Sequence, residues 1–240
     1  MTRRTPHATK VNELSLYTPL EDSIPKWWAA RRPWDGHGTR YDPVVKLTAN
    51  RKRLHGKWAC PDFVLVVRND FPFAVAPQIE VTTVEVKLWR DRPNIADVYE
   101  ALAQRRLAHK AVLLVYATRD DIEGWGSADG SRGSTRPSSS NFRDVVEIAS
   151  EHGVGLVVAD NLHDTSKWTE HVRARRTEPK PLWMSRLLDM SFTDDQERRN
   201  VQDMLGATEA PSMGRHPSGF VANVVASVVN PPSSSARRAA

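Results

Sequence analysis

The chain has 240 residues, of which 40% are hydrophobic and 26% are charged. This length allows one core of about 150 residues with an appendage, and the composition is typical of a soluble globular protein rather than a fibrous or membrane-spanning one. The single cysteine, Cys60, excludes an intramolecular disulfide and favours a reducing compartment, so we expect a cytoplasmic location.

The formal net charge of the chain is +5. An excess of cations favours an acidic partner, of which nucleic acid is the commonest class. Part of the excess lies near the two ends of the sequence, where arginines are typical of solvated tails: Arg3, Arg4, Arg237 and Arg238. Charge alone is therefore a weak indication of DNA binding, and the prediction depends on the motifs.

The first predicted element is a helix that begins at Asn12. Two prolines, Pro19 and Pro25, are expected to bound this helix or divide it into two pieces. It carries the glutamates Glu13 and Glu21, and acidic residues on an amphipathic helix are most often solvated. The apolar positions at helical spacing are Leu14, Leu16, Tyr17, Leu20, Ile24, Trp27 and Trp28.

Two central runs are rich in β-branched residues and are predicted as buried strands, at 63–67 and 79–88, after a shorter strand at 44–47. Side chains alternate between the two faces of a strand, so Glu85 and Lys87 share one face of the second run. The opposite face consists of Val84, Val86 and Leu88, which are expected to pack in a core.

The rest of the core alternates between helical and strand patterns. Apolar residues at spacings of three and four predict a helix over 95–107, and a strand follows at 111–117. A long loop rich in Gly, Ser and Pro precedes a helix at 142–151 and a strand at 154–159. Strands joined through helices pair in parallel, so the expected fold is a three-layer α/β/α sandwich with a central mixed sheet.

The predicted domain organisation has three parts. Residues 1–160 form the core with its N-terminal helix, and residues 161–206 form a basic helical C-terminal extension. Residues 207–240 are rich in Pro, Ser and Ala and are expected to be a low-complexity, flexible tail.

The chemistry of the chain is concentrated in Asp62, Glu85 and Lys87. Two carboxylates from neighbouring strands are the oxygen ligands that Mg²⁺ prefers, and the backbone carbonyl of Val86 is a further candidate ligand. A metal held there would polarise a phosphoryl group and lower the pKa of a bound water. A lysine on the same face can orient or deprotonate that water and stabilise the developing negative charge. These residues indicate metal-dependent hydrolysis of a phosphodiester.

A cationic turn precedes the central strands. Arg51, Lys52 and Arg53 are consecutive, and Lys57 follows them. Such a cluster is most often a solvated loop tip, but it lies close in sequence to the acidic centre. We therefore predict that these four residues contact the phosphates of a nucleic acid.

Pro61-Asp62, a gap of 22 residues and then Glu85-Val86-Lys87, followed by a helix and a strand, resembles the PD-(D/E)xK nuclease superfamily. The resemblance covers at most residues 44–159 and implies a restriction-endonuclease-like fold that acts on DNA. It implies Asp62 and Glu85 as ligands of Mg²⁺, which Mn²⁺ is expected to replace, and Lys87 as the catalytic lysine.

The resemblance also implies two further residues. An acidic residue on the first helix approaches the metal in many members, and Glu21 is slightly preferred here over Glu13. Some members carry a Gln on the helix after the lysine and a Tyr four residues later. In this chain Gln104 is followed at that spacing by Ala108, so only the first half of the signature is present.

Other interpretations stay open at this point. The same fold can serve as a non-catalytic DNA-binding or assembly module, in which the acidic centre is structural. Glu85 and Lys87 can also form an ordinary exposed ion pair at a strand end, which contributes little to stability. RNA as a substrate, and a homodimer or a larger nucleoprotein assembly, agree equally well with the residues.

Overall fold

A computed structural model of the chain describes residues 12–31, 39–49, 60–72, 74, 78–89, 93–118, 121 and 139–205. The cationic turn with Arg51, Lys52, Arg53 and Lys57 lies outside these residues, as do most of the predicted 119–140 loop and the tail at 207–240. Among the described helices, none combines the length and the apolar character that crossing a bilayer requires.

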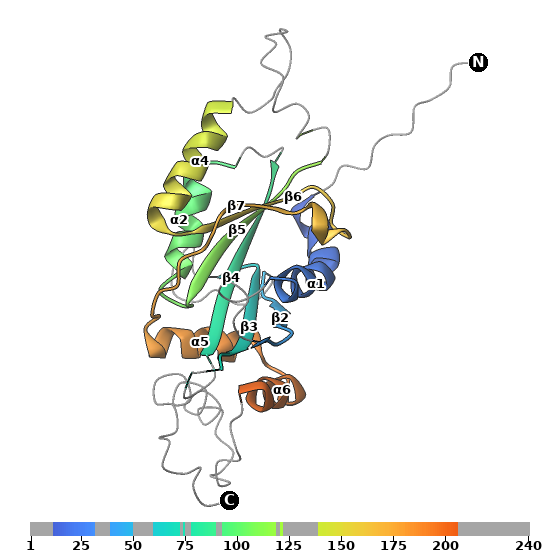
Figure 1. Ribbon diagram of the computed structural model, residues 1–240, viewed down its shortest axis with the longest axis vertical. Coiled ribbons are helices and arrows are strands. Elements are labelled where there is room, and N and C mark those ends of the chain that lie inside the picture. The colour runs from blue at the N-terminus through green and yellow to red at the C-terminus, as the bar shows by residue number, and fades with distance from the viewer. Residues whose placement is uncertain are drawn as a thin grey trace, which may run out of the picture.

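Within the described residues, seven strands form one mixed sheet with the order β1-β3-β4-β5-β6-β7, and β2 pairs with β3 beside β1 (Figure 1). β3 and β4 are antiparallel, β4, β5 and β6 are parallel, and β7 is antiparallel to β6. The strands are β1 Thr39–Arg40, β2 Val44–Leu47, β3 Phe63–Asp70, β4 Gln78–Leu88, β5 Lys110–Tyr116, β6 Gly155–Ala159 and β7 Thr169–Val172. The mixed sheet and the parallel β4-α2-β5-α4-β6 order confirm the predicted α/β class.

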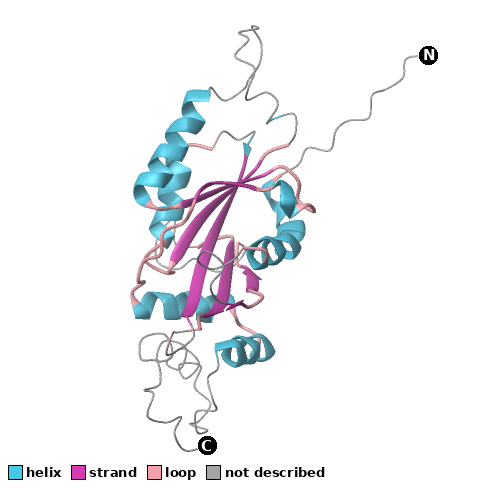
Figure 2. Cartoon of the chain, in the orientation of Figure 1, coloured by secondary structure: helices cyan, strands magenta, loops and turns pink. Residues whose placement is uncertain are grey.

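Helices cover both faces of this sheet (Figure 2). α1 packs on one face, against β3, β4 and β5, while α2, α4 and α5 pack on the other. The helices are α1 Glu13–Ala29, α2 Ile95–Gln104, α4 Ser139–His152, α5 Pro181–Ser191 and α6 Asp195–Leu205, with a short 3₁₀ turn, η3, at Thr165–Lys167. Since β4 lies between two helical layers, both of its faces are buried, which explains its nearly continuous run of buried side chains.

α1 corrects one expectation from the sequence. Pro19 and Pro25 neither end nor divide this helix, which runs without interruption from Glu13 to Ala29. A proline removes one backbone hydrogen bond from a helix interior, but packing of the apolar face offsets that cost here. Asn12 caps the first turn by accepting a hydrogen bond from the backbone of Ser15.

The segment after β6 also differs from the expected helical extension. Residues 169–172 add β7 to the sheet as an edge strand, and α5 packs against the strands beneath it. Asp194 caps the start of α6 by accepting hydrogen bonds from the backbone N–H groups of Gln196 and Glu197. Much of the segment 161–205 is therefore joined directly to the core.

Candidate active site

Asp62 lies at the end of the β3–β4 ladder, directly before β3, and its side chain is buried, with 6% of its surface exposed. Phe63 pairs with Val84, so the two carboxylates that flank this pair, Asp62 and Glu85, are neighbours across the two strands. Asp62 Oδ2 accepts a hydrogen bond of 2.7 Å from the backbone N–H of Val86, and Oδ1 accepts one of 2.8 Å from the hydroxyl of Tyr17.

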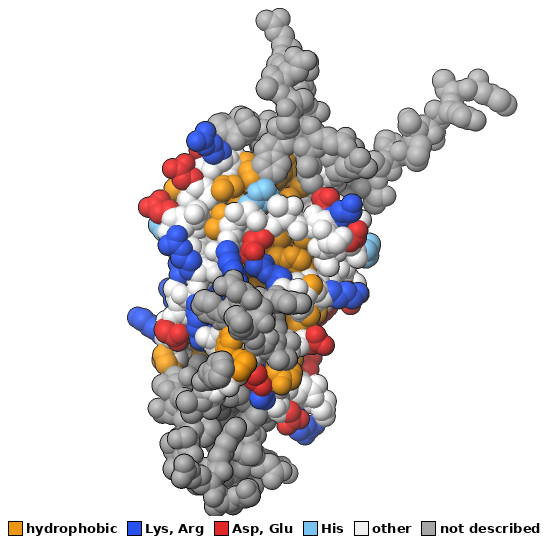
Figure 3. Space-filling view, in the orientation of Figure 1, with side chains coloured by type: hydrophobic (Ala, Val, Ile, Leu, Met, Phe, Trp, Pro, Cys, Tyr) orange, Lys and Arg blue, Asp and Glu red, His pale blue; other side chains and the backbone are white. Residues whose placement is uncertain are grey.

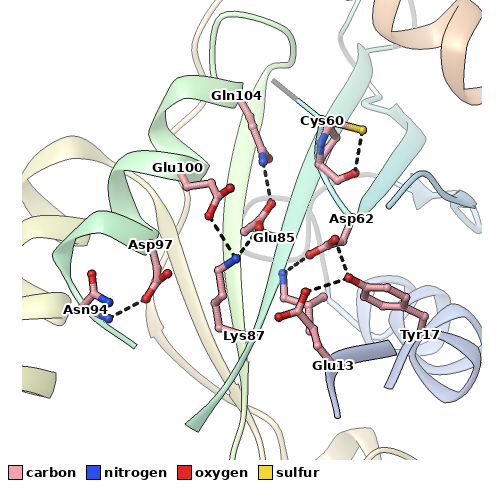
Figure 4. Close-up of polar contacts among 12 residues, drawn as sticks. Glu13, Tyr17, Cys60, Asp62, Glu85, Lys87, Asn94, Asp97, Glu100 and Gln104 are labelled. Carbon is pink, nitrogen blue, oxygen red and sulfur yellow. Dashed lines mark hydrogen bonds and ion pairs between the residues drawn. The ribbon is translucent and has the colours of Figure 1, made fainter. Parts of the chain in front are cut away.

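Glu85 is also buried, with 4% of its surface exposed, and both of its oxygens are hydrogen-bonded (Figure 4). Oε1 accepts from Lys87 Nζ at 2.7 Å, and Oε2 accepts from Gln104 Nε2 at 2.8 Å. The structure therefore brings together four of the predicted site residues, which are Asp62, Glu85, Lys87 and Gln104. A pair this deeply buried is not the exposed ion pair of a solvated strand end.

Gln104 reaches Glu85 because it lies on the buried face of α2. The buried residues of this helix are Val98, Ala101 and Gln104, at successive spacings of three. The Oε1 atom of Gln104 is buried without a hydrogen-bond partner, whereas its Nε2 is directed at Glu85. Burying an amide oxygen without a hydrogen-bond partner costs free energy.

Glu100 is a site residue that the sequence reasoning missed. Its carboxylate lies 3.1 Å from Lys87 Nζ, so the lysine is shared between Glu85 and Glu100. The signal was present in the helical spacing, because Glu100 and Gln104 are four residues apart and so lie on one side of α2. Finding it required knowing which side of α2 faces β4.

The charges of this cluster do not balance. Burial raises the pKa of Asp62, and the hydrogen bonds from Val86 and Tyr17 offset only part of that rise. Burial also raises the pKa of Glu85, and the negative charge of Asp62 raises it further. For Lys87, burial lowers the pKa, but the negative charges of Glu85 and Glu100 outweigh it, so the net pKa is raised and the lysine stays protonated.

Glu13 rather than Glu21 approaches the centre from α1. The hydroxyl of Tyr17 lies 2.9 Å from Glu13 Oε1 as well as 2.8 Å from Asp62 Oδ1. A hydroxyl has one proton, so only one of these carboxylates can accept it at a time. The Glu21 side chain is exposed on the same helix, two turns further along. The structure thus favours Glu13, the candidate that the sequence had ranked second.

The residues present meet the requirements of Mg²⁺ in part. No group of three or more His, Cys, Asp and Glu side chains is arranged to hold a metal ion within the described ranges. Mg²⁺, however, is usually bound through one or two carboxylates and keeps several of its waters. Asp62 and Glu85 supply two carboxylates. The Tyr17 hydroxyl lies between Asp62 Oδ1 and Glu13 Oε1 and can donate to only one of them at a time, and a cation would stabilise this pair of carboxylate oxygens.

Two predicted contributions are not seen in the contacts. The carbonyl of Val86 was a candidate metal ligand, but the contact that this residue makes with the site is the hydrogen bond from its N–H to Asp62, while its side chain is buried in the core. The predicted phosphate contacts of Arg51, Lys52, Arg53 and Lys57 lie outside the described residues. Both stay predictions.

No protein-family model and no curated protein matches the chain. Among solved structures, the chain is similar to the SPO1766 protein of unknown function from Silicibacter pomeroyi, with a TM-score of 0.28 and 12% sequence identity. That match covers 75% of this chain and 88% of the other. A similarity at this level carries no argument about fold or function, so membership of the PD-(D/E)xK superfamily stays a prediction from the residues.

Proposed function

We propose that the protein is a metal-dependent endonuclease that hydrolyses DNA phosphodiester bonds on a restriction-endonuclease-like core of the PD-(D/E)xK type. One observation carries the proposal: Asp62 and Glu85 are buried side by side, and one protonated lysine, Lys87, is hydrogen-bonded to Glu85. Two buried carboxylates beside one cation have an excess of negative charge, which a divalent cation would neutralise.

In this proposal Asp62 and Glu85 hold Mg²⁺, and the bound ion supplies charge stabilisation at the phosphate and a water of lowered pKa. The chain fixes the orientation of both ligands. The Val86 N–H and the Tyr17 hydroxyl hold Asp62, while Gln104 Nε2 holds Glu85. Hydrogen bonds of this kind reduce the reorganisation that a flexible carboxylate would need when it binds a metal.

Lys87 acts as a hydrogen-bond donor and a positive charge rather than as a general base. Its raised pKa keeps the ammonium protonated at neutral pH, so it has no lone pair with which to accept a proton from water. An ammonium can instead donate hydrogen bonds to the attacking water and to a phosphate oxygen, where negative charge develops. Of the two roles that the sequence left open, the electrostatics favour orientation and charge stabilisation.

A non-catalytic module on the same fold is the second candidate. The observation in its favour is that the four carboxylate oxygens of Asp62 and Glu85 are all hydrogen-bonded within the protein. A hydrogen-bond network in which every carboxylate oxygen has a donor can stabilise this end of the β3–β4 pair without taking part in catalysis. It would not require a metal, which separates the two candidates experimentally.

The test is cleavage of supercoiled, linear and single-stranded DNA, and of RNA, with Mg²⁺ or Mn²⁺. Wild type is compared with Glu85→Gln and Lys87→Met, which preserve the shape of the two side chains while removing their charges. Metal-dependent cleavage by wild type that both variants lose supports the nuclease. Binding of DNA by wild type without cleavage by either metal supports the module.

A further inference from the structure

A basic segment crosses the end of the sheet where β4, β5 and β6 begin. Residues 173–180, called here the basic strap, follow β7 and lead into α5. The backbone N–H of Arg175 donates to Gly153 O at 3.0 Å, and the N–H of Thr177 donates to His109 O at 2.8 Å. Further along, Arg176 Nη1 donates to Ile79 O at 3.2 Å, so the strap is tied in turn to the residues just before β6 and β5 and to the first residues of β4.

The strap carries four cations, Arg173, Arg175, Arg176 and Lys180, and one carboxylate, Glu178. Glu178 pairs with Arg176 at 3.3 Å, and its own side chain is largely exposed. The guanidinium of Arg175 instead donates to the backbone carbonyl of Ser150, at 3.0 Å. A carbonyl positions a guanidinium without neutralising its charge, so the strap has a clear positive excess.

Part of this charge has a structural reason. Arg175 and Arg105 donate to carbonyls in the last turn of α4, where cations favourably oppose the helix dipole. Arg173 and Lys180 have no such reason: their side chains are exposed and make no hydrogen bond or ion pair within the described residues. Two exposed cations with no partner among the described residues therefore stand on a segment that is otherwise firmly attached.

The positive surface continues onto α5. Trp183 is partly buried, and Arg186 and Arg106 both lie over its ring, at 5.2 and 5.6 Å from the centroid. Stacking on an aromatic ring holds a guanidinium in place while leaving its charge available. In Figure 3, Lys and Arg side chains recur down the side of the molecule on which α4, α2 and α5 lie in Figure 1.

This surface and the candidate active site both lie along β4. Ile79 contacts the strap and Glu85 belongs to the site, and six positions along β4 separate them. At about 3.3 Å per residue the separation is about 20 Å, which corresponds to about six base-pair steps of a DNA duplex. Phosphates at that distance from a scissile bond belong to the same bound duplex.

We propose that the basic strap, together with Arg186 of α5, binds backbone phosphates of duplex DNA about half a helical turn from the phosphodiester held at Asp62 and Glu85. The inference rests on the proposed function, because it takes the substrate of that site as its ligand. The contacts are with phosphates and not with bases, so they contribute affinity and register without sequence specificity. A neutral or basic partner would gain less from this positive surface.

The test replaces three exposed cations whose side chains make no hydrogen bond or ion pair with any residue that the structure describes, as Arg173→Gln, Lys180→Gln and Arg186→Gln in one protein. Binding to a duplex of about 24 base pairs is measured in Ca²⁺ over a range of salt concentrations. Loss of three phosphate contacts is expected to weaken binding at least about tenfold and to reduce the slope of log K against log salt by about 2.7. In cleavage, KM rises by a similar factor while kcat at saturating DNA stays unchanged.

The matched control removes the same number of exposed cations from α1, η3 and α6, as Lys26→Gln, Lys167→Gln and Arg199→Gln. This control is expected to retain wild-type affinity and slope. An equal loss in both triple variants would overturn the proposal, because it would show a general effect of net charge. Unchanged binding in the strap variant, or no duplex binding by wild type, would overturn it as well.

Failure of the proposed function has a different signature. A wild-type protein that binds duplex DNA but does not cleave it with either metal contradicts the nuclease proposal. If the strap variant then loses affinity and the control does not, the phosphate-binding surface is supported without the chemistry.

Discussion

β4 carries two buried carboxylate–lysine pairs that are nearly identical in isolation. Glu80 lies 2.6 Å from Lys110 of β5, and Glu85 lies 2.7 Å from Lys87 of β4 itself. The exposed fractions of the side chains are 4% and 18% in the first pair and 5% and 19% in the second. Distance and burial therefore do not distinguish a structural pair from a candidate catalytic one.

The surroundings of the two pairs differ. Glu80 is opposite Val67 in the β3–β4 register, whereas Glu85 lies beside Asp62. Lys87 is in addition shared with Glu100. In a buried pair of opposite charges the two charges neutralise each other. A buried cluster with more carboxylates than cations instead keeps a net negative charge. The comparison teaches that excess charge, more than the presence of an ion pair, indicates a site for a metal.

The largest expected difference between the two pairs is in catalysis. Glu85→Gln and Lys87→Met are each expected to lower kcat for DNA cleavage by about a thousandfold, because charge stabilisation at a reacting centre has that magnitude. Glu80→Gln is expected to leave kcat within about twofold of wild type at a temperature where all variants are folded. Single-turnover cleavage of a labelled duplex measures all three. A comparable loss in Glu80→Gln would remove the distinction between the pairs.

In the metal-free protein, Glu80→Gln should lower the stability of the fold more than Glu85→Gln does. Glu80→Gln removes the carboxylate that pairs with Lys110, and we expect it to lower the free energy of unfolding by about 1 to 3 kcal/mol. Glu85→Gln relieves the repulsion from Asp62 while Lys87 keeps Glu100 as a partner, so unchanged or higher stability is expected. Urea unfolding in EDTA measures both. Equal destabilisation by the two substitutions would show that Glu85 is a structural residue.

The two glutamates of α1 provide a smaller contrast. Glu13 shares the hydroxyl of Tyr17 with Asp62, so Glu13→Gln is expected to lower kcat/KM about tenfold through weaker metal binding. Glu21→Gln changes an exposed side chain on the same helix, and no effect is expected. The metal concentration required for half-maximal cleavage is the readout. The reverse result would restore the choice that the sequence favoured.

The smallest expected effect is on the pH dependence of stability. Because the pKa of Glu85 is raised by folding, the folded state binds more protons than the unfolded state above about pH 4.5, the ordinary range of this group. Stability of the metal-free protein should therefore fall as pH rises from about 5 to 8, by about 1 kcal/mol or more relative to Glu85→Gln. His109, whose pKa burial lowers, is common to both proteins, so its contribution cancels in the difference. A difference that does not change with pH would contradict the assignment.

The sequence was sufficient for the elements that depend on local pattern. Alternation and β-branched residues located β3 and β4, and the motif spacing brought Asp62, Glu85 and Lys87 together as the structure does. These predictions succeeded because the side-chain period of a strand is fixed, and because Asp62 and Glu85 flank a pair of residues that oppose each other in the ladder.

The remainder depended on tertiary packing, which a single sequence does not contain. The uninterrupted α1 reflects burial of its apolar face, which outweighs two prolines. The roles of Glu13 and Glu100 depend on how α1 and α2 are rotated against β4, and the spacing of acidic residues along a helix does not determine that rotation. β7 is a short edge strand with three exposed residues out of four, so it lacks the apolar alternation that identifies a strand.

Titration of Mn²⁺ into metal-free protein, followed by calorimetry, tests the excess of negative charge most directly. We expect wild type and Glu80→Gln to bind one ion with similar affinity and with release of protons, since the raised pKa values of Asp62 and Glu85 leave protons to be displaced. Glu85→Gln should bind at least about tenfold more weakly. Absence of Mn²⁺ binding by wild type, or equal binding by Glu85→Gln, would contradict a metal centre at this end of β4.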